Sequence, residues 1–377
     1  MAVAEHGRRE EARAFGAFRP EEWMLRKTPW SAILRDSRTP NQAEVEAHPE
    51  FPHVTWRLEP AQKGKVAVAA GRGGPLDIAY EVHGHGPIHI VWIMGLGGFK
   101  TAWQRQTKDF SHTQADKYSS LIIDNRGVGE SDKPMMRYST SEMARDVLEV
   151  LDHIGWTEKR QLHVIGISMG GMIAQELAHL VPERIATLSL VSTASGLFNT
   201  VGFVENLRNR INLFIPRSID NQLAHVKRNL FTDKWLESPD NHEYTKQPFP
   251  TNCDRFAAGE ISKRKDPAHF NRTGFMAQAI AAGWHYKSPE QLREIADKVG
   301  RERIMVVHGT EDRMITFPHA RVLIEGLEGI GEQQKGEVKK HLIDGQGHCI
   351  PIEMREEFKT WLEALITRGE ELNKTSA

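Results

Sequence analysis

The sequence predicts an α/β fold in which a mostly parallel central sheet is covered by helices on both faces and carries an inserted helical segment. Two observations predict this fold. Short apolar runs alternate with helical segments between residues 76 and 191, which is typical of parallel strands joined by crossover helices. The alternation stops from about residue 195 to 287, where no strand-like run occurs, and resumes at residue 304.

Each expected element has a local signal. Short apolar runs bounded by glycine or polar turns predict strands at residues 66–70, 76–82, 88–94, 121–124, 162–167, 185–191, 304–307 and 338–343. Helical spacing of apolar residues predicts helices at residues 139–154, 169–180 and 351–372. The first of these helices has a clear start, because Ser139 and Glu142 have the spacing of a capping box.

The same patterns divide the chain into four segments. Residues 1–60 are rich in charge and carry Trp23, Trp30 and Trp56 without a sustained apolar period. We interpret them as an N-terminal arm anchored by a few aromatic side chains. Residues 61–194 are expected to form the first part of the core, residues 195–290 the helical insertion, and residues 291–377 the second part of the core.

The composition excludes several classes of function. Hydrophobic residues make up 39% and charged residues 26% of the 377 residues, which is typical of a soluble globular chain. The net charge of −1 gives no overall field that attracts nucleic acid or anionic lipid. Two cysteines, Cys253 and Cys349, cannot build a disulfide framework. Residues 1–20 lack a secretory signal and no apolar run is long enough to cross a bilayer, so we expect a soluble, cytoplasmic protein.

The strongest chemical signal is a serine between glycines, in Gly166-Ile167-Ser168-Met169-Gly170. This pentapeptide lies where the strand expected at 162–167 turns directly into the helix expected at 169–180. In a nucleophile elbow the serine occupies a strained turn, and the flanking glycines prevent collisions between neighbouring side chains. We therefore predict that Ser168 is a nucleophile. A passive serine in a glycine-rich turn is the alternative.

A serine nucleophile needs a histidine base that is oriented by a carboxylate. His348 stands in a turn after one expected strand, and Asp312 stands in a loop after another. Such loops gather at one edge of a parallel sheet, where the elbow also lies. We predict that His348 is the base and Asp312 the acid, with the adjacent Glu311 as the rival acid. Alternatively, His348 is a solvated loop residue, and Asp312 caps a helix or pairs with Arg313.

The tetrahedral intermediate of such a reaction needs two N–H donors. We assign the backbone N–H of Met169 and that of Leu96, which lies in a glycine-rich loop at residues 94–98, with Gly97 as the alternative to Leu96. The same loop begins like a dinucleotide-binding fingerprint, but Lys100 stands where the third glycine is required. His83 and His85 have no third ligand nearby. We therefore expect neither a cofactor nor a metal.

Together these residues resemble the α/β hydrolase superfamily, specifically its cap-bearing esterases, lipases and related enzymes of the proline iminopeptidase and methylesterase type. The resemblance covers residues 76–366 and includes the chain order Ser168, Asp312, His348. Residues 124–131 look like the family's Asp-x-Arg-Gly-x-Gly-x-Ser motif, which implies that Arg126 and Ser131 belong to the scaffold. Met94 replaces the family's usual histidine. The serine nucleophile argues against epoxide hydrolases and haloalkane dehalogenases, which the resemblance associates with aspartate.

The resemblance implies that residues 195–290 form the family's cap. We predict a serine hydrolase that cleaves a carboxylic ester, including a lactone, of a small, partly apolar substrate through an acyl-enzyme. Cleavage of a thioester or a carbon–carbon bond by the same residues stays open, as does a non-catalytic ligand-binding protein with this fold. Some aromatic cap residues are expected to face the nucleophile. Trp284 is the candidate for the substrate pocket, with packing of cap against core as the alternative.

Overall fold

The structure is a computed structural model that describes residues 41–198, 219–240, 243, 247–331 and 335–375. The chain divides into two compact units, Met1–Thr39 and Pro40–Ala377, and every described residue belongs to the second unit. The expected aromatic anchors Trp23 and Trp30 lie outside the described residues.

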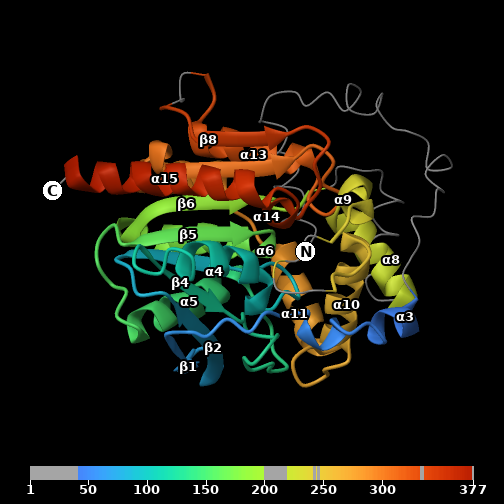
Figure 1. The fold of residues 1–377 in the computed structure, drawn as a ribbon. Coiled ribbons are helices and arrows are strands. Elements are labelled where there is room, and N and C mark those ends of the chain that lie inside the picture. Colours follow the sequence, from blue (N-terminus) through green and yellow to red (C-terminus); the bar gives the residue numbers. More distant parts are fainter. Residues whose placement is uncertain (1–40, 199–218, 241–242, 244–246, 332–334, 376–377) are drawn as a thin grey trace, which may run out of the picture. The chain divides into compact units, whose positions relative to one another are not determined.

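An eight-stranded sheet forms the centre of the second unit, in the order β1-β2-β4-β3-β5-β6-β7-β8 (Figure 1). The strands are β1 (Gln62–Val68), β2 (Leu76–His83), β3 (Ile88–Ile93), β4 (Tyr118–Ile123), β5 (Leu162–Ile167), β6 (Ile185–Val191), β7 (Ile304–Gly309) and β8 (Lys339–Ile343). Strand β2 pairs antiparallel with β1 and with β4, whereas all other pairs are parallel. The predicted mostly parallel sheet is confirmed.

Strand β1 is longer than the sequence pattern indicates. It begins at Gln62, and its first four residues are exposed at the edge of the sheet. The first buried residue is Val66, where the apolar pattern begins. Exposed residues of an edge strand need no apolar side chains, so they leave no signal in the hydrophobic pattern.

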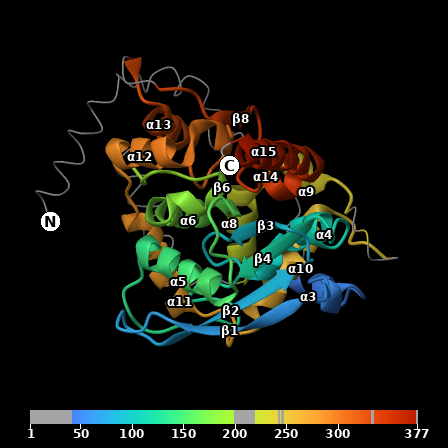
Figure 2. The same cartoon turned by 90° about the vertical axis from the view of Figure 1, so that its left-hand side faces the viewer.

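Helices cover both faces of the sheet, as predicted (Figure 2). One face carries α5 (Thr140–His153), α6 (Met169–Leu180), α12 (Pro289–Val299) and α13 (Phe317–Glu328), and the other carries α4 (Gln104–Ser111) and α15 (Arg355–Thr375). Val91 and Ile93 of β3 belong to the first hydrophobic core, whereas Trp92 packs with Phe110 and Phe358 in the second. The alternation of side chains along each strand thus supplies two cores.

The C-terminal helix differs from the prediction of one helix over 351–372. The structure has α14 (Ile350–Glu353) followed by α15, separated at Met354, whose φ of −124° and ψ of 51° leave the helical region. Glu353, at the end of α14, accepts hydrogen bonds from the side chains of Thr232 and Gln346, each at 2.6 Å. These contacts are made by residues outside α14 and α15, so the spacing of apolar residues along the predicted helix does not indicate them.

The predicted helical insertion lies between β6 and β7. Its described helices are α8 (Ile219–Leu230), α9 (Asp233–Glu237), α10 (Asn252–Arg264) and α11 (Arg272–Trp284). Helix α10 begins at a capping box formed by Thr251 and Asp254. The insertion shares a small core with the segment before β1, in which Ile261 packs with Val45 and Val54. In the described ranges, no helix combines the length and apolar character that crossing a membrane requires.

Trp56 is the predicted aromatic anchor that the structure describes. Its side chain is buried, and the guanidinium carbons of Arg105 and Arg355 lie 5.7 and 5.9 Å from its ring centroid. Its backbone N–H donates to the side chain of Gln104 at 2.8 Å. Trp56 therefore packs on α4 and the start of α15.

Candidate active site

Ser168 occupies a strained turn between β5 and α6. Its φ of 57° and ψ of −125° lie in a region that residues with a side chain rarely adopt. The two flanking glycines are sterically required: a Cβ atom on Gly166 would lie 2.3 Å from the Gly170 oxygen, and one on Gly170 would lie 2.1 Å from the Ile93 oxygen. The local geometry is that of the predicted elbow, with the Ser168 side chain partly exposed.

His348 and Asp312 form a buried hydrogen-bonded pair. His348 Nδ1 lies 2.7 Å from Asp312 Oδ2, and each residue is 3% exposed. A carboxylate accepts, so Nδ1 carries the hydrogen of this bond and Nε2 of the neutral ring is an acceptor. The other carboxylate oxygen, Oδ1, accepts from the backbone N–H groups of Met314 and Ile315 at 2.8 and 2.9 Å.

The rival carboxylate, Glu311, points elsewhere. It is exposed, and in the described part of the chain its side chain makes no hydrogen bond or ion pair. Its backbone N–H donates to the Gln346 oxygen at 3.0 Å. Of the two adjacent acids, only Asp312 contacts His348.

A second histidine, His308, lies next to the Asp312 carboxylate. Its Nε2 is 3.5 Å from Asp312 Oδ2 and 2.7 Å from the Ile315 oxygen. A carbonyl oxygen only accepts, so Nε2 carries the hydrogen. Burial lowers the pKa of His308, which keeps the ring neutral beside the carboxylate.

Ser168 and His348 are held at the same edge of the sheet by two residues that follow β6. Thr193 Oγ1 donates to the backbone carbonyl oxygen of Ser168 at 2.7 Å, and Ser192 Oγ donates to the backbone carbonyl oxygen of His348 at 2.8 Å. Ser168, Ser192, Asp312 and His348 thus follow the carboxyl ends of four successive parallel strands, β5 to β8. Ser192 and Thr193 were not predicted from the sequence, where their only signal is that two polar residues directly follow a buried strand.

The loop at residues 94–98 borders Ser168. A Cβ atom on Gly95 would lie 3.0 Å from the Ser168 Cβ, so the loop can approach this closely only with glycine there. Asn125 Nδ2 donates to the Met94 oxygen at 2.9 Å and fixes the start of the loop. In the part of the chain that the structure describes, the backbone N–H groups of Leu96 and Met169 donate to no other group.

Gln278 on α11 fixes the other side of this loop and was not predicted from the sequence. It is fully buried; its Oε1 accepts from the Gly97 N–H at 2.9 Å, and its Nε2 donates to the Arg126 oxygen at 2.8 Å. The Gly97 N–H, the alternative donor for an oxyanion, is therefore engaged by Gln278. The available signal was a lone glutamine within an otherwise apolar helical run.

A sequence model of the alpha/beta hydrolase fold family matches residues 88–354, well over half of the chain. The chain belongs to the α/β hydrolase family. The "Putative carbamate hydrolase RutD" of Azorhizobium caulinodans is 27% identical over 261 residues, which cover 68% of this chain and 84% of that protein.

Two solved structures of this hydrolase fold are also similar. A thermophilic esterase from Thermogutta terrifontis has a TM-score of 0.60 at 21% identity and covers 81% of this chain and 99% of its own. A meta-cleavage product hydrolase from Pseudomonas fluorescens also has a TM-score of 0.60, at 18% identity, and covers 81% of this chain and 97% of its own. These two likenesses concern the fold.

In this α/β hydrolase, the loop at residues 124–131 is held from two sides. Arg126 Nε and Nη2 each donate to the Asp146 carboxylate at 2.6 Å, which ties the loop to α5. Ser131 Oγ donates to the Asp124 oxygen at 2.5 Å and accepts from the Ala79 N–H at 2.8 Å, which ties it to β2. Both residues therefore support the loop through buried hydrogen bonds.

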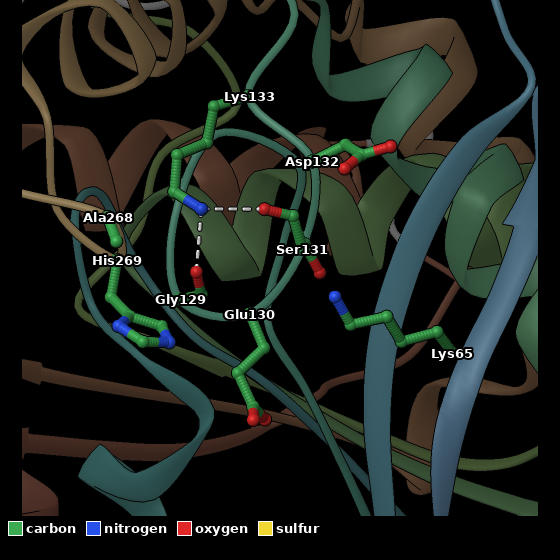
Figure 3. A pocket seen from close by; sticks show the side chains of 8 residues that line it. All are labelled: Lys65, Gly129, Glu130, Ser131, Asp132, Lys133, Ala268 and His269. Carbon is green, nitrogen blue, oxygen red and sulfur yellow. Dashed lines mark hydrogen bonds between the residues drawn. The ribbon is translucent and has the colours of Figure 1, made fainter.

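A polar cavity of about 320 Å³ lies beside this loop (Figure 3). It is lined by Lys65, Gly129, Glu130, Ser131, Asp132, Lys133, Ala268 and His269. The Lys133 ammonium donates to the backbone oxygens of Gly129 and Ser131 at 2.6 and 2.8 Å. The hydrolase's predicted catalytic residues do not line this cavity, so we do not regard it as the candidate active site.

Trp284, the predicted pocket residue, lies at the end of α11. It is 58% exposed, and the Arg137 guanidinium carbon is 5.9 Å from its ring centroid. Trp284 is six residues beyond Gln278. At 100° per residue, the two side chains leave the helix in directions about 120° apart. The role of Trp284 as a pocket residue stays a prediction.

The histidines excluded as metal ligands have other partners. His83 Nδ1 lies 3.0 Å from His112 Nε2, and its Nε2 lies 3.1 Å from Glu81. His85 Nε2 lies 2.7 Å from Asp116 at the surface. Within the described ranges, no group of three or more histidine, cysteine or acidic residues could hold a metal ion.

Proposed function

We propose that the protein is a serine hydrolase of carboxylic esters, including lactones, in which Ser168 is the nucleophile, His348 the base and Asp312 the residue that orients the base. The observation that supports this most strongly is the strained backbone of Ser168 at the same sheet edge as the 2.7 Å hydrogen bond between His348 and Asp312. Within the α/β hydrolase family, the protein would then be one of the cap-bearing esterases of the proline iminopeptidase and methylesterase type.

The reaction begins with proton transfer. His348 Nε2 accepts the proton of the Ser168 hydroxyl. At the same time Ser168 Oγ attacks the ester carbonyl carbon and forms a tetrahedral intermediate. Asp312 accepts from Nδ1, holds the ring in this tautomer and stabilises the imidazolium. The carbon–oxygen bond to the alcohol then breaks, and the alcohol takes the proton from Nε2.

Water completes the cycle. His348 Nε2 accepts a proton from a water molecule, whose oxygen attacks the acyl-enzyme carbonyl. The second tetrahedral intermediate collapses, the carboxylic acid leaves, and Ser168 recovers its proton from His348. Each step uses only groups that these residues and water supply.

The backbone N–H groups of Leu96 and Met169 are the proposed donors to the oxyanion. Neither donates elsewhere in the described part of the chain, whereas the N–H of Gly97 donates to Gln278. Met169 is the first residue of α6, so the partial positive charge of the helix N-terminus also favours the developing negative charge. This supports Leu96 over Gly97 as the second donor.

The relatives support a hydrolase but differ in the bond that they cleave. Their names include a carbamate hydrolase, an esterase and a meta-cleavage product hydrolase. A triad of this kind is compatible with esters, thioesters and carbon–carbon bonds. A panel of esters that vary in acyl and alcohol length, with lactones and thioesters, identifies the preferred bond.

The nucleophile is tested by covalent labelling. Wild type should react with a fluorophosphonate probe and hydrolyse activated esters, whereas Ser168→Ala should not be labelled and should lose several orders of magnitude in kcat, because nucleophile and base act as a unit. A Ser168→Ala protein that keeps most of the wild-type esterase activity would contradict the proposal. An unlabelled, inactive wild type would instead favour the non-catalytic ligand-binding protein.

A further inference from the structure

Helix α10 of the insertion runs between the two halves of the proposed site. Phe256 lies near its start, and its ring centroid is 5.0 Å from that of Phe231. The backbone oxygen of Leu230, the residue before Phe231, accepts a hydrogen bond from the backbone N–H of His348 at 3.1 Å. Near the other end, Lys263 Nζ lies 3.5 Å from the Gly97 oxygen. The helix therefore connects the segment that carries His348 to the loop that carries Leu96.

One face of α10 carries partly exposed side chains. Phe256, Glu260 and Lys263 follow one another at helical intervals and are all partly exposed, whereas Ala257 and Ile261 are buried in the core that the insertion shares with the segment before β1. Lys263 is 17% exposed and Glu260 13%, so both charges are largely removed from water. Such burial is unusual for charged residues on a helix that could turn them to the surface.

Glu260, Lys263 and Arg264 form an ion cluster, which we call the α10 cluster. Lys263 Nζ lies 2.6 Å from Glu260 Oε1, and Arg264 donates to the other oxygen, Oε2. Burial raises the pKa of Glu260, but the two cations outweigh this effect and lower the pKa to about 2. Glu260 is therefore ionised, and two positive charges and one negative charge leave the cluster with a net charge of +1.

The Lys263 ammonium is held in place beside the loop. Its Nζ lies 4.9 Å from the centroid of the Phe270 ring. Phe270 and Phe275 both flank Gly97, since a Cβ atom there would lie 3.4 and 2.9 Å from them. Glu260, the Gly97 oxygen and the Phe270 ring thus position Lys263 next to the proposed oxyanion donor.

Helix α10 also packs near the base. Phe256, one turn before Glu260, packs against the small apolar cluster that contains Cys349, the residue that follows His348. The helix that carries Lys263 therefore contacts both the segment of the base and the oxyanion loop.

We propose that Lys263, positioned by Glu260, binds a carboxylate carried by the substrate, so that the enzyme's preferred substrates are anionic esters or lactones. This inference rests on the proposed esterase function and specifies its substrate class. An ammonium has three N–H donors, and in the described part of the chain two of them have partners, Glu260 and the Gly97 oxygen. The third donor is available for a substrate oxygen, in a charge-assisted hydrogen bond.

The alternative is that Lys263 only ties the insertion to the loop through Gly97. A tether supports every substrate equally, whereas a carboxylate site distinguishes charged from neutral substrates. The test therefore compares kcat/KM for the mono-4-nitrophenyl ester of adipic acid with kcat/KM for 4-nitrophenyl heptanoate, which has an apolar end in place of the carboxylate. The ratio of the two values reports the preference for the anion.

Lys263→Met should lower this ratio about tenfold or more, because it removes a charge-assisted hydrogen bond. Glu260→Gln should raise the ratio, because it increases the net charge of the cluster. The matched control is Lys265→Met, which removes a positive charge from the end of the same helix. Lys265 pairs with Glu46 at 2.8 Å and is 51% exposed, so both kcat/KM values should stay within about twofold of wild type.

An unchanged ratio in Lys263→Met, with equal losses for both esters, would overturn the carboxylate site in favour of a tether. The carboxylate site would also be overturned if wild type prefers the heptanoate ester and Glu260→Gln does not raise the ratio of the two kcat/KM values. Titration calorimetry with glutarate supplies a readout without turnover: wild type should bind the dianion more tightly than Lys263→Met. Fluorophosphonate labelling of Ser168 tests the proposed function separately, because labelled protein without any anion preference refutes only this inference.

Discussion

Replacing Asp312 by asparagine tests the proposed triad through the tautomer of the base. The two oxygens of Asp312 have different partners: Oδ1 accepts from the N–H groups of Met314 and Ile315, and Oδ2 accepts from His348 Nδ1. An asparagine side chain offers one oxygen acceptor and one amide donor. Two backbone N–H groups can pair only with the oxygen, so we expect the amide nitrogen to face His348.

The magnitude follows from this arrangement. An amide N–H donates, so Nδ1 of His348 has to accept, and the hydrogen of the neutral ring moves to Nε2. Nε2 can then no longer accept the proton of Ser168. Loss of the correct tautomer in a serine triad lowers kcat about 10⁴-fold, which corresponds to about 5 kcal/mol of transition-state stabilisation.

The assay is steady-state hydrolysis of 4-nitrophenyl acetate by Asp312→Asn, with Glu311→Gln as the matched control. Glu311 is adjacent and exposed, and its side chain has no hydrogen bond in the described residues, so Glu311→Gln should keep kcat within about twofold. Thermal unfolding verifies that both variants are folded. The reasoning is refuted if Asp312→Asn keeps more than about a tenth of the wild-type kcat, or if Glu311→Gln is the more damaged variant.

Three further predictions concern the helical insertion and stability. Gln278→Leu leaves the Gly97 N–H and the Arg126 oxygen unpaired, so kcat should fall about tenfold or more while KM changes little; a rise in KM alone would contradict this. Burial lowers the pKa of His319 from 6.5 to about 4, so between about pH 6.5 and 4 the unfolded chain binds a proton that the folded chain does not. Between pH 7 and 5 this should lower the free energy of unfolding by about 2 kcal/mol, and urea titrations of His319→Gln should show a shallower loss. Trp284→Ala should lower kcat/KM selectively for a long acyl ester at unchanged melting temperature, because apolar contact with the exposed Trp284 ring would stabilise only an acyl chain long enough to reach it. Equal losses for short and long esters with a lowered melting temperature would make Trp284 structural.

Much of the fold could be predicted because its signals are local. The buried strands β5 and β6 and the helix α6 have the bounds that their apolar runs predict. Ser139 accepts from the Glu142 N–H at 3.1 Å and starts α5, as the spacing of the two residues indicates. Elements with weaker local signals were missed in part: β1 begins on exposed edge residues, and the last helix breaks at Met354.

The sequence by itself determined the elements of this protein and the order of its candidate site. Short apolar runs that alternate with helical segments predict a parallel sheet, and the glycines around Ser168 are the residues that a strained turn requires. Both signals come from residues that are close together in the chain. Only the tertiary structure decided which side chains meet. Asp312 rather than Glu311 contacts His348, and Gln278 and Lys263 reach Gly97 from helices 166 to 181 residues away in the chain. Such contacts depend on the direction of each side chain after packing, and the spacing of residue types along the chain does not contain that direction.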